Sequence, residues 1–413
     1  MLRLREGIRA NIVTVVISIV VGLYMVEGGL TFLGLGQPHD RIAAARTAAI
    51  AVTARAVATE KAVVELDVEY DQRTILEVIE GLNAQGVDAV PEAPGVAFNK
   101  IIGTNKEDTI HLLTLGGVSN KTTVCCIESG KYMVYKSDRY GFNNPNSEWN
   151  TTRVDWLLTG DSFAVGQAVQ EGEDIAGQIR VITNQSAISL GSSGNGPLKE
   201  LAALIEYAGA IKPRKVFWIY YEGNDLTVNL RVEKSKPLLM KYMEDGFTQN
   251  LINRQKEIDR MLREYIVSKQ AQAQAQPKPH SLLYKTRWTR LYAIRNILDA
   301  DDVAIADVDY PLFARILTKA KVKVEAWGGE LYFVYLPEYE RYNKKVISQE
   351  SFRNKSKVIE MVKELHIPVI DIHQEVFADH PDPLALFPLR LEGHYNAEGY
   401  SEVAKAIITG VKK

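Results

Sequence analysis

The fold is decided by residues 154–166, which read VDWLLTGDSFAVG. The apolar run Val154–Leu158 predicts a short buried strand. Gly160 follows it and lets the backbone turn sharply, and Gly166 allows another segment to pack closely. The stretch therefore predicts a strand, a tight turn and a helix in immediate succession.

Asp161 and Ser162 fall at the start of that helix, where backbone N–H groups lack partners within the helix. Ser and Asp are common caps of helix N-termini, so the pair can serve structure alone. The hydroxyl can also act as a nucleophile, because nearby amides can bind the anion that forms when it attacks a carbonyl. The turn by itself favours neither interpretation.

Strands and helices alternate from Val154 to the C-terminus. Short buried strands that alternate with helices predict a parallel sheet covered on both faces. In such sheets functional groups gather at the carboxyl ends of the strands. The expected strands are Val154–Leu158, Ala187–Leu190, Val216–Tyr221, Leu331–Tyr335 and Pro368–Ile372, and the expected helices follow Ser162 and cover Pro197–Ala208, Phe313–Trp327, Ser351–Leu365 and Asn396–Ile408.

Three later segments match what a nucleophilic serine needs: Ser192–Pro197 (SSGNGP), Glu222–Asp225 (EGND) and Glu392–Asn396 (EGHYN). With Gly160–Ser162 they occur in the order of the Ser, Gly, Asn and His blocks of the SGNH (GDSL) hydrolase family, which the chain resembles from Val154 onward. The resemblance implies a three-layer α/β/α, flavodoxin-like fold with a parallel five-stranded sheet. It also implies a serine hydrolase of esters that works without a cofactor.

The resemblance assigns a role to each block. Ser162 is the expected nucleophile and His394 the expected general base, because an alcohol at its free pKa needs a base. Glu392 is expected to orient the imidazole, at a place where the family most often has aspartate. The backbone N–H groups of Ser162 and Gly194 and the side-chain amide of Asn224 form the expected oxyanion hole.

Two alternatives stay open at this point. Gly191 lies in the same glycine-rich loop as Gly194 and can replace it as a donor. Asp371 and His373 form a second acid–histidine pair, and both side chains would point to one face of a strand. The pair lacks the Asn-x-x-Gly helix start that follows His394, so it is the weaker candidate for the base.

The N-terminus predicts a membrane anchor. Residues 12–35 carry one charge, Glu27, and a helix of this length spans the ~30 Å core of a bilayer. Arg3, Arg5 and Arg9 precede the run and favour a cytoplasmic N-terminus, with the rest of the chain on the periplasmic or extracellular side. No small-x-small site follows directly, which favours an uncleaved anchor over a signal peptide.

The expected organisation is an anchor at 1–36, a membrane-proximal segment at 37–150 and a hydrolase-like domain at 151–413. A helical insertion at about 232–310 interrupts the last part. It is either a lid or partner-binding element, or a solvated excursion. It contains the low-complexity stretch AQAQAQPKP at 271–279, which favours a mobile loop.

Cys125 and Cys126 are the two cysteines, and adjacent residues rarely have the geometry of a relaxed disulfide. They also lack the Cys-x-x-Cys spacing of metal sites, so no metal is expected. The formal net charge of −2 gives no indication of a nucleic-acid partner.

Three functions fit the sequence. The expected one is a membrane-anchored serine esterase that cleaves a small ester or an acylated glycan through an acyl-enzyme. The second is an O-acetyltransferase that passes the acyl group to a hydroxyl of a cell-envelope or exported polysaccharide, since the same residues serve both acceptors. The third is a non-catalytic binding or assembly protein on the same scaffold.

Overall fold

The computed structural model describes residues 55, 57–93, 112–275, 308–343 and 352–412. Ala62–Lys269 and Asp307–Lys413 together make one compact unit. The membrane anchor expected at 1–36 lies outside the described residues. Among the helices that are described, none has both the length and the apolar character needed to cross a bilayer.

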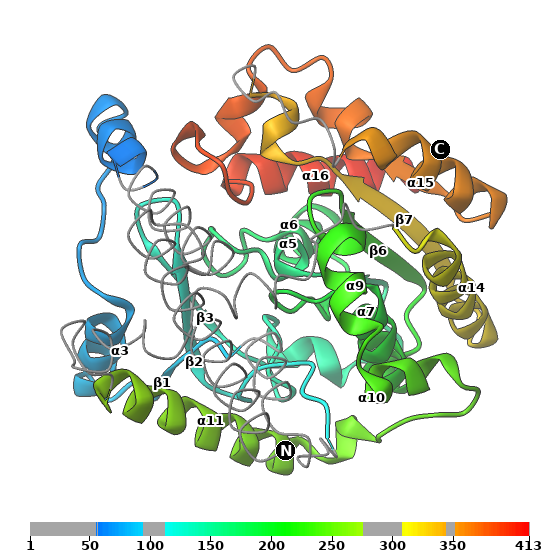
Figure 1. Cartoon of the computed structure of the whole chain (residues 1–413), viewed down its shortest axis with the longest axis horizontal. Helices are drawn as coiled ribbons and strands as arrows, with labels where there is room; N and C mark the ends of the chain where they lie inside the picture. Colours follow the sequence, from blue (N-terminus) through cyan, green and yellow to red (C-terminus); the bar gives the residue numbers. More distant parts are fainter. Residues whose placement is uncertain (1–54, 56, 94–111, 276–307, 344–351, 413) are drawn as a thin grey trace, which may run out of the picture. The chain divides into compact units, whose positions relative to one another are not determined.

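A five-stranded sheet forms the centre of this unit, and all its strands are parallel (Figure 1). The strand order is β5-β4-β6-β7-β8. The chain leaves β4 toward one side to form β5 and returns to the other side to form β6. The carboxyl ends of β4 and β6 therefore lie at a topological switch point of the sheet. The bounds are β4 Trp156–Thr159, β5 Ala187–Ser189, β6 Lys215–Tyr221, β7 Glu330–Leu336 and β8 Val369–Asp371.

Successive strand residues face two different cores. Leu157 and Trp218 belong to one apolar cluster, and their neighbours Leu158 and Ile219 belong to the other. Both faces are apolar because helices cover both of them, as expected of a parallel sheet. The predicted five-stranded parallel sheet is confirmed.

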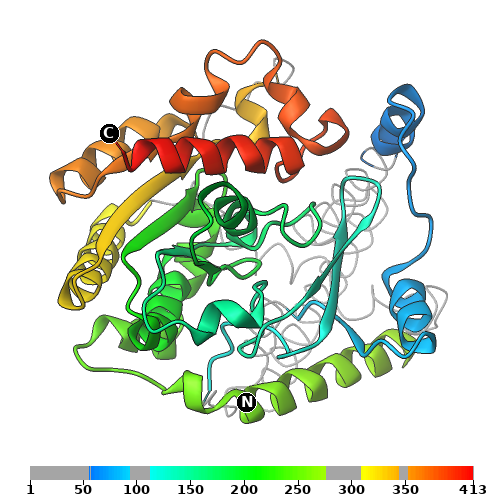
Figure 2. The same cartoon turned by 180° about the vertical axis from the view of Figure 1, so that it is seen from behind.

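The helices complete a three-layer arrangement. Helices α6 and α16 pack on one face, where α16 is the red helix of Figure 2, and α7, α14 and α15 pack on the other. A π-helical turn at Leu204–Ala208 and the short α8, Gly209–Ile211, extend α7. The bounds are α5 Ser162–Val165, α6 Ile175–Thr183, α7 Pro197–Ala203, α14 Tyr310–Ala326, α15 Lys355–Glu364 and α16 Ala397–Gly410.

A second, three-stranded sheet precedes the main one and belongs to the same compact unit. Strands β1 (Ala89–Pro91) and β2 (Thr122–Ile127) pair in parallel, and β3 (Tyr132–Lys136) pairs antiparallel to β2. Helix α3, Ile75–Ala84, packs against β1 and β2. A capping box between Thr74 and Glu77 starts α3 and supplies partners for two N–H groups that the helix leaves unpaired.

The insertion after β6 begins with α9 (Leu230–Glu233) and α10 (Pro237–Met240) and continues into α11 (Gln255–Ala275). Leu251 and Leu262 are fully buried in the main core, so this part of the insertion packs on the domain, whereas Arg263, Glu264, Val267 and Ser268 of α11 are exposed. Residues 271–275 continue α11, which corrects the expectation that the low-complexity stretch is a loop from its start. The rest of that stretch lies outside the described residues.

Candidate active site

The turn after β4 fixes the position of Ser162. A Cβ atom on Gly160 would lie 2.9 Å from the Cβ atoms of Ala164 in α5 and Ile219 in β6, so only glycine allows the turn to lie this close to both elements. The Asp161 carboxylate accepts the N–H of Phe163 at 2.9 Å and caps α5. The turn therefore places Ser162, a residue that is 8% exposed, at the N-terminus of α5.

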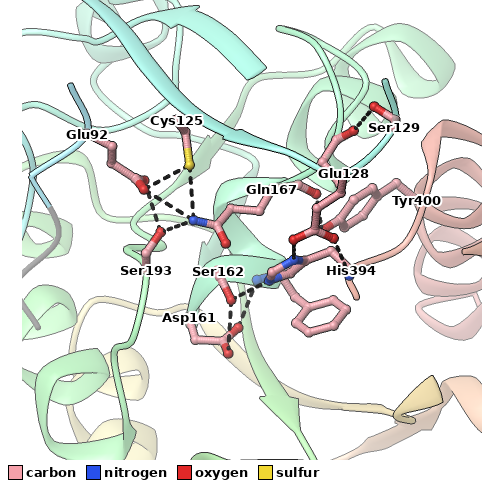
Figure 3. Close-up of polar contacts among 12 residues, drawn as sticks. Glu92, Cys125, Glu128, Ser129, Asp161, Ser162, Gln167, Ser193, His394 and Tyr400 are labelled. Atoms are coloured by element: carbon pink, nitrogen blue, oxygen red, sulfur yellow. Dashed lines mark hydrogen bonds and ion pairs between the residues drawn. The ribbon is translucent and has the colours of Figure 1, made fainter. Parts of the chain in front are cut away.

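Ser162 and His394 meet although 232 positions separate them. The Ser162 Oγ atom lies 2.8 Å from His394 Nε2 (Figure 3). His394 comes from the loop before α16, whose start is capped by Asn396 through a 2.9 Å hydrogen bond from the N–H of Gly399. The ring of Phe163 packs against the imidazole at a centroid distance of 4.7 Å and limits its rotation.

The other side of the imidazole contacts Glu128. Glu128 Oε1 lies 2.9 Å from His394 Nδ1, and Glu128 Oε2 accepts the backbone N–H of His394 at 2.9 Å (Figure 3). A carboxylate can only accept, so the proton sits on Nδ1 and Nε2 is left as the acceptor for the serine hydroxyl. Both oxygens of Glu128 thus accept hydrogen bonds from His394.

Glu392 does not hold the imidazole, which corrects the sequence-based expectation. Its carboxylate lies beside Glu340. Burial is the main cause of the raised Glu340 pKa, and the Glu392 carboxylate raises that pKa further. The chain that leads into His394 is irregular, because Leu389 and Arg390 both adopt left-handed backbone angles, with φ of 53° and 56°. A carboxyl two residues before a histidine shares its face only on a regular extended segment.

Sequence reasoning missed Glu128 because it lies outside the recognised blocks. It stands in the turn between β2 and β3, in the segment expected to be membrane-proximal. The one local signal is an acidic residue in a turn that ends in Gly130, which is common on protein surfaces. Ser129 anchors the turn to the main domain by donating its hydroxyl to the carbonyl of Ala168 at 2.7 Å.

Burial and charge set the protonation of the site. Burial, the largest single influence, lowers the pKa of His394, but the Glu128 carboxylate, with smaller contributions from Cys126 and Asp161, raises it, and the net pKa of the imidazole is above its usual value. Burial raises the pKa of Asp161 to about 6. Asp161 Oδ2 lies 3.5 Å from the Ser162 oxygen, against 2.8 Å for the imidazole, so the hydroxyl is better placed to donate to His394.

The three expected oxyanion donors follow β4, β5 and β6, which are neighbours in the sheet. No described residue accepts a hydrogen bond from the backbone N–H of Ser162 or of Gly194. Asn224 Oδ1 accepts from Asn229 at 3.1 Å, which leaves the NH₂ end of the Asn224 amide as the donor. Gly191 is a poorer candidate, since its N–H already donates to the Ser189 hydroxyl at 3.1 Å.

The three-stranded sheet also contacts the glycine-rich loop. Glu92, just after β1, accepts the hydroxyl of Ser193 at 2.9 Å and the thiol of Cys125 at 3.0 Å. Gln167 donates to Ser193 at 2.5 Å and completes this group of side chains (Figure 3). Ser193 is the neighbour of Gly194, so these contacts hold the loop that carries an expected oxyanion donor. Cys125 and Cys126 are free cysteines.

The second acid–histidine pair is engaged elsewhere. His373 Nδ1 lies 2.8 Å from the Tyr342 hydroxyl, and Asp371 forms an ion pair with Lys355 at 2.8 Å. Burial lowers the pKa of His373. The two side chains therefore do not act as a pair on Ser162. Within the described ranges, no three His, Cys, Asp or Glu side chains gather closely enough to hold a metal ion.

A hydroxyl, an imidazole and a carboxylate in series activate a serine for attack on a carbonyl. The imidazole can take the hydroxyl proton while the carboxylate stabilises the charge that results. N–H donors at strand ends can bind the developing oxyanion. The arrangement is recognised by geometry rather than by chain order, since here the carboxylate precedes the serine and the histidine follows it.

No protein-family model and no curated protein matches this sequence. Among solved structures, the chain is similar to the lipase/acylhydrolase from Enterococcus faecalis, with 13% identity and a TM-score of 0.37 over 63% of this chain and 95% of that one. It is also similar to the acetyl xylan esterase AlAXEase, with 10% identity and a TM-score of 0.36 over 62% of this chain and 100% of that one. A third is a carbohydrate esterase family 2 enzyme with a carbohydrate-binding domain from Corynascus thermopiles (Myceliophthora fergusii), with 10% identity and a TM-score of 0.33 over 64% and 68% of the two chains. Similarity at this distance carries no information about the activity or substrate of this chain.

Proposed function

We propose that this protein is an SGNH-type serine esterase in which Ser162 is the nucleophile, His394 the general base and Glu128 the residue that positions the imidazole. The observation that carries the proposal is the continuous series from Ser162 Oγ to His394 Nε2 at 2.8 Å and from His394 Nδ1 to Glu128 at 2.9 Å. A non-catalytic protein has no need to keep a serine, a histidine and a carboxylate within hydrogen-bonding distance of one another.

The reaction has two halves. His394 Nε2 takes the Ser162 proton as the oxygen attacks the ester carbonyl, and the backbone N–H groups of Ser162 and Gly194 with the Asn224 amide stabilise the oxyanion. Collapse of this intermediate expels the alcohol, which receives the proton from His394, and leaves an acyl-enzyme. Water then attacks with its proton passing to His394, and the acid leaves as the Ser162 hydroxyl forms again.

A small ester or an acetylated glycan at a membrane surface stays the prediction from the sequence, together with the anchor at residues 1–36. The acyl-enzyme could equally be resolved by a sugar hydroxyl. Incubation with an acetyl ester and a polysaccharide acceptor distinguishes the two, because hydrolysis yields free acetate and transfer yields acetylated polysaccharide.

The test of the proposal is turnover of p-nitrophenyl acetate by the wild type and by Ser162→Ala, together with labelling by a fluorophosphonate. Ser162→Ala should reduce kcat by at least about 10³-fold and abolish labelling. Ser235→Ala is the matched control, because the Ser235 hydroxyl donates only to a local carbonyl, that of Val232. A wild-type protein that neither turns over the ester nor labels at Ser162 would disprove the proposal.

A further inference from the structure

Asn229 connects the two loops that carry the expected oxyanion donors. It is the last residue of the π-helical turn Asp225–Asn229 that follows β6. Its side-chain Nδ2 donates to the backbone carbonyl of Asn195 at 2.7 Å and to Asn224 Oδ1 at 3.1 Å. Both hydrogens of its NH₂ group are therefore used, one in the loop of Gly194 and the other on Asn224.

These contacts determine which end of the Asn224 amide faces the site. The two ends of an amide side chain have nearly the same shape, so a neighbour must select between them. The Asn195 backbone carbonyl can only accept a hydrogen bond, and unlike a side-chain amide it cannot flip. The NH₂ end of Asn229 must therefore face it. The second hydrogen of that group then demands Asn224 Oδ1. The NH₂ end of Asn224 is left over, and it is the end that can stabilise an oxyanion.

The surroundings of Asn229 hold its hydrogen bonds to Asn195 and Asn224 in place. A Cβ atom on Gly196 would lie 2.5 Å from Asn229 Cβ, so the glycine-rich loop packs directly against it. The buried Glu233 accepts the N–H groups of Gly196 and Leu198 at 2.7 and 2.9 Å. These contacts hold the loop just after Asn195, and the hydrogen bond from Ser193 to Glu92 holds it just before, so Asn229 meets a fixed carbonyl.

We propose that Asn229 is a positioning residue of the oxyanion hole, which selects the donor end of Asn224 and sets its distance from the loop of Gly194. The inference rests on the proposed esterase function. It adds a residue that would act on the oxyanion through Asn224 and Asn195, and whose amide also lies beside the buried Asp225 carboxylate.

The discriminating change is Asn229→Asp, which keeps the shape of the side chain and replaces its donor with an acceptor. A carboxylate there faces the Asn224 amide with an oxygen, so Asn224 reverses, donates to the new carboxylate and turns Oδ1 toward the oxyanion. The site loses a donor and gains a repulsive oxygen. We expect kcat on p-nitrophenyl acetate to fall by about 10²–10³-fold with KM changed by less than about threefold, a larger loss than that of Asn224→Ala.

Asn229→Ala serves as the comparison. It frees the Asn224 amide to adopt either orientation, so a loss of about tenfold or less in kcat is expected. A merely structural role predicts instead that each variant loses kcat only as far as it loses folded protein, because a carboxylate facing the Asn195 carbonyl beside the buried Asp225 would itself destabilise the loop. Circular dichroism and the thermal midpoint of each variant establish that the compared proteins are folded.

A double-mutant cycle completes the test. If Asn229 acts through Asn224, then adding Asn229→Asp to Asn224→Ala should cost less than about threefold more in kcat. Full additivity of the two effects, or wild-type kcat in Asn229→Asp, would overturn the inference while wild-type turnover and Ser162 labelling leave the esterase proposal intact. Absence of turnover in the wild type instead removes the esterase proposal itself.

Discussion

Replacing Glu128 by glutamine should nearly abolish the esterase activity of Ser162 while leaving the fold in place. In the wild type, two donors converge on the Glu128 carboxylate, the backbone N–H of His394 and the Nδ1–H of its imidazole. Glutamine offers one oxygen and one NH₂ group. One of the two donors must then face an NH₂ group, and each orientation of the amide has a definite consequence.

If the glutamine oxygen accepts from the backbone, its NH₂ group faces Nδ1. The imidazole then carries its proton on Nε2, and Nε2 can no longer accept the proton of Ser162. If the amide is reversed, its NH₂ group opposes the backbone N–H of His394 and pushes the loop away. The favourable orientation of the glutamine is therefore the one that produces the inactive tautomer.

The size of the loss follows from the charges. The Glu128 carboxylate and the imidazolium that forms during the reaction are about 4 Å apart between charge centres, and at an effective dielectric constant near 20 their attraction is of order 4 kcal/mol. The two side chains are only 13% and 16% exposed, so solvent screens the pair little. Since each 1.36 kcal/mol corresponds to tenfold in rate, loss of this attraction alone should lower kcat by about 10³-fold, and the inactive tautomer should lower it further.

The assay is steady-state hydrolysis of p-nitrophenyl acetate, with Glu392→Gln as the matched control. The control makes the same chemical change two residues from His394, at the carboxylate favoured by the sequence pattern, and should alter kcat by less than about threefold. Glu128→Ala should be less damaging than Glu128→Gln, because it removes the carboxylate without imposing the wrong tautomer. Activity of Glu128→Gln within threefold of the wild type, or the larger loss in Glu392→Gln, would refute the reasoning.

Two further predictions concern the base and the turn. The Glu128 carboxylate raises the pKa of His394, and the neutral imidazole is the base, so activity falls as the pH drops below that pKa. In Glu128→Ala the pKa is lower and the acid limb of the kcat/KM profile should move to lower pH; an unmoved or rising limb argues against the assigned pair. Gly160→Ala should cost about 1–3 kcal/mol in urea unfolding, because its Cβ atom would meet two others at 2.9 Å. Gly81→Ala, where nothing lies within 4 Å in helix α3, is the control and should be neutral or slightly stabilising.

The sequence by itself determined the features that local signals encode. Mostly apolar runs of four to six residues between turn residues predicted the five strands of the main sheet. Gly160 before Ser162 and Asn396 after His394 marked a sharp turn and a helix start, and both occur where they were expected. Because parallel strands end at one edge of a sheet, the same pattern indicated that the blocks around Ser162 and Asn224 would lie near each other.

Only the tertiary structure decided which carboxylate meets the imidazole. Glu128 and Glu392 are the same residue type, and the sequence pattern favoured Glu392 because it is near His394 along the chain. The residue in contact with His394 is 266 positions away, in a hairpin of a separate sheet whose turn is fastened to the main domain. The orientation of the Asn224 amide is decided in the same way, by a carbonyl in another loop. Such contacts depend on how distant segments pack, and no local periodicity or spacing carries that information.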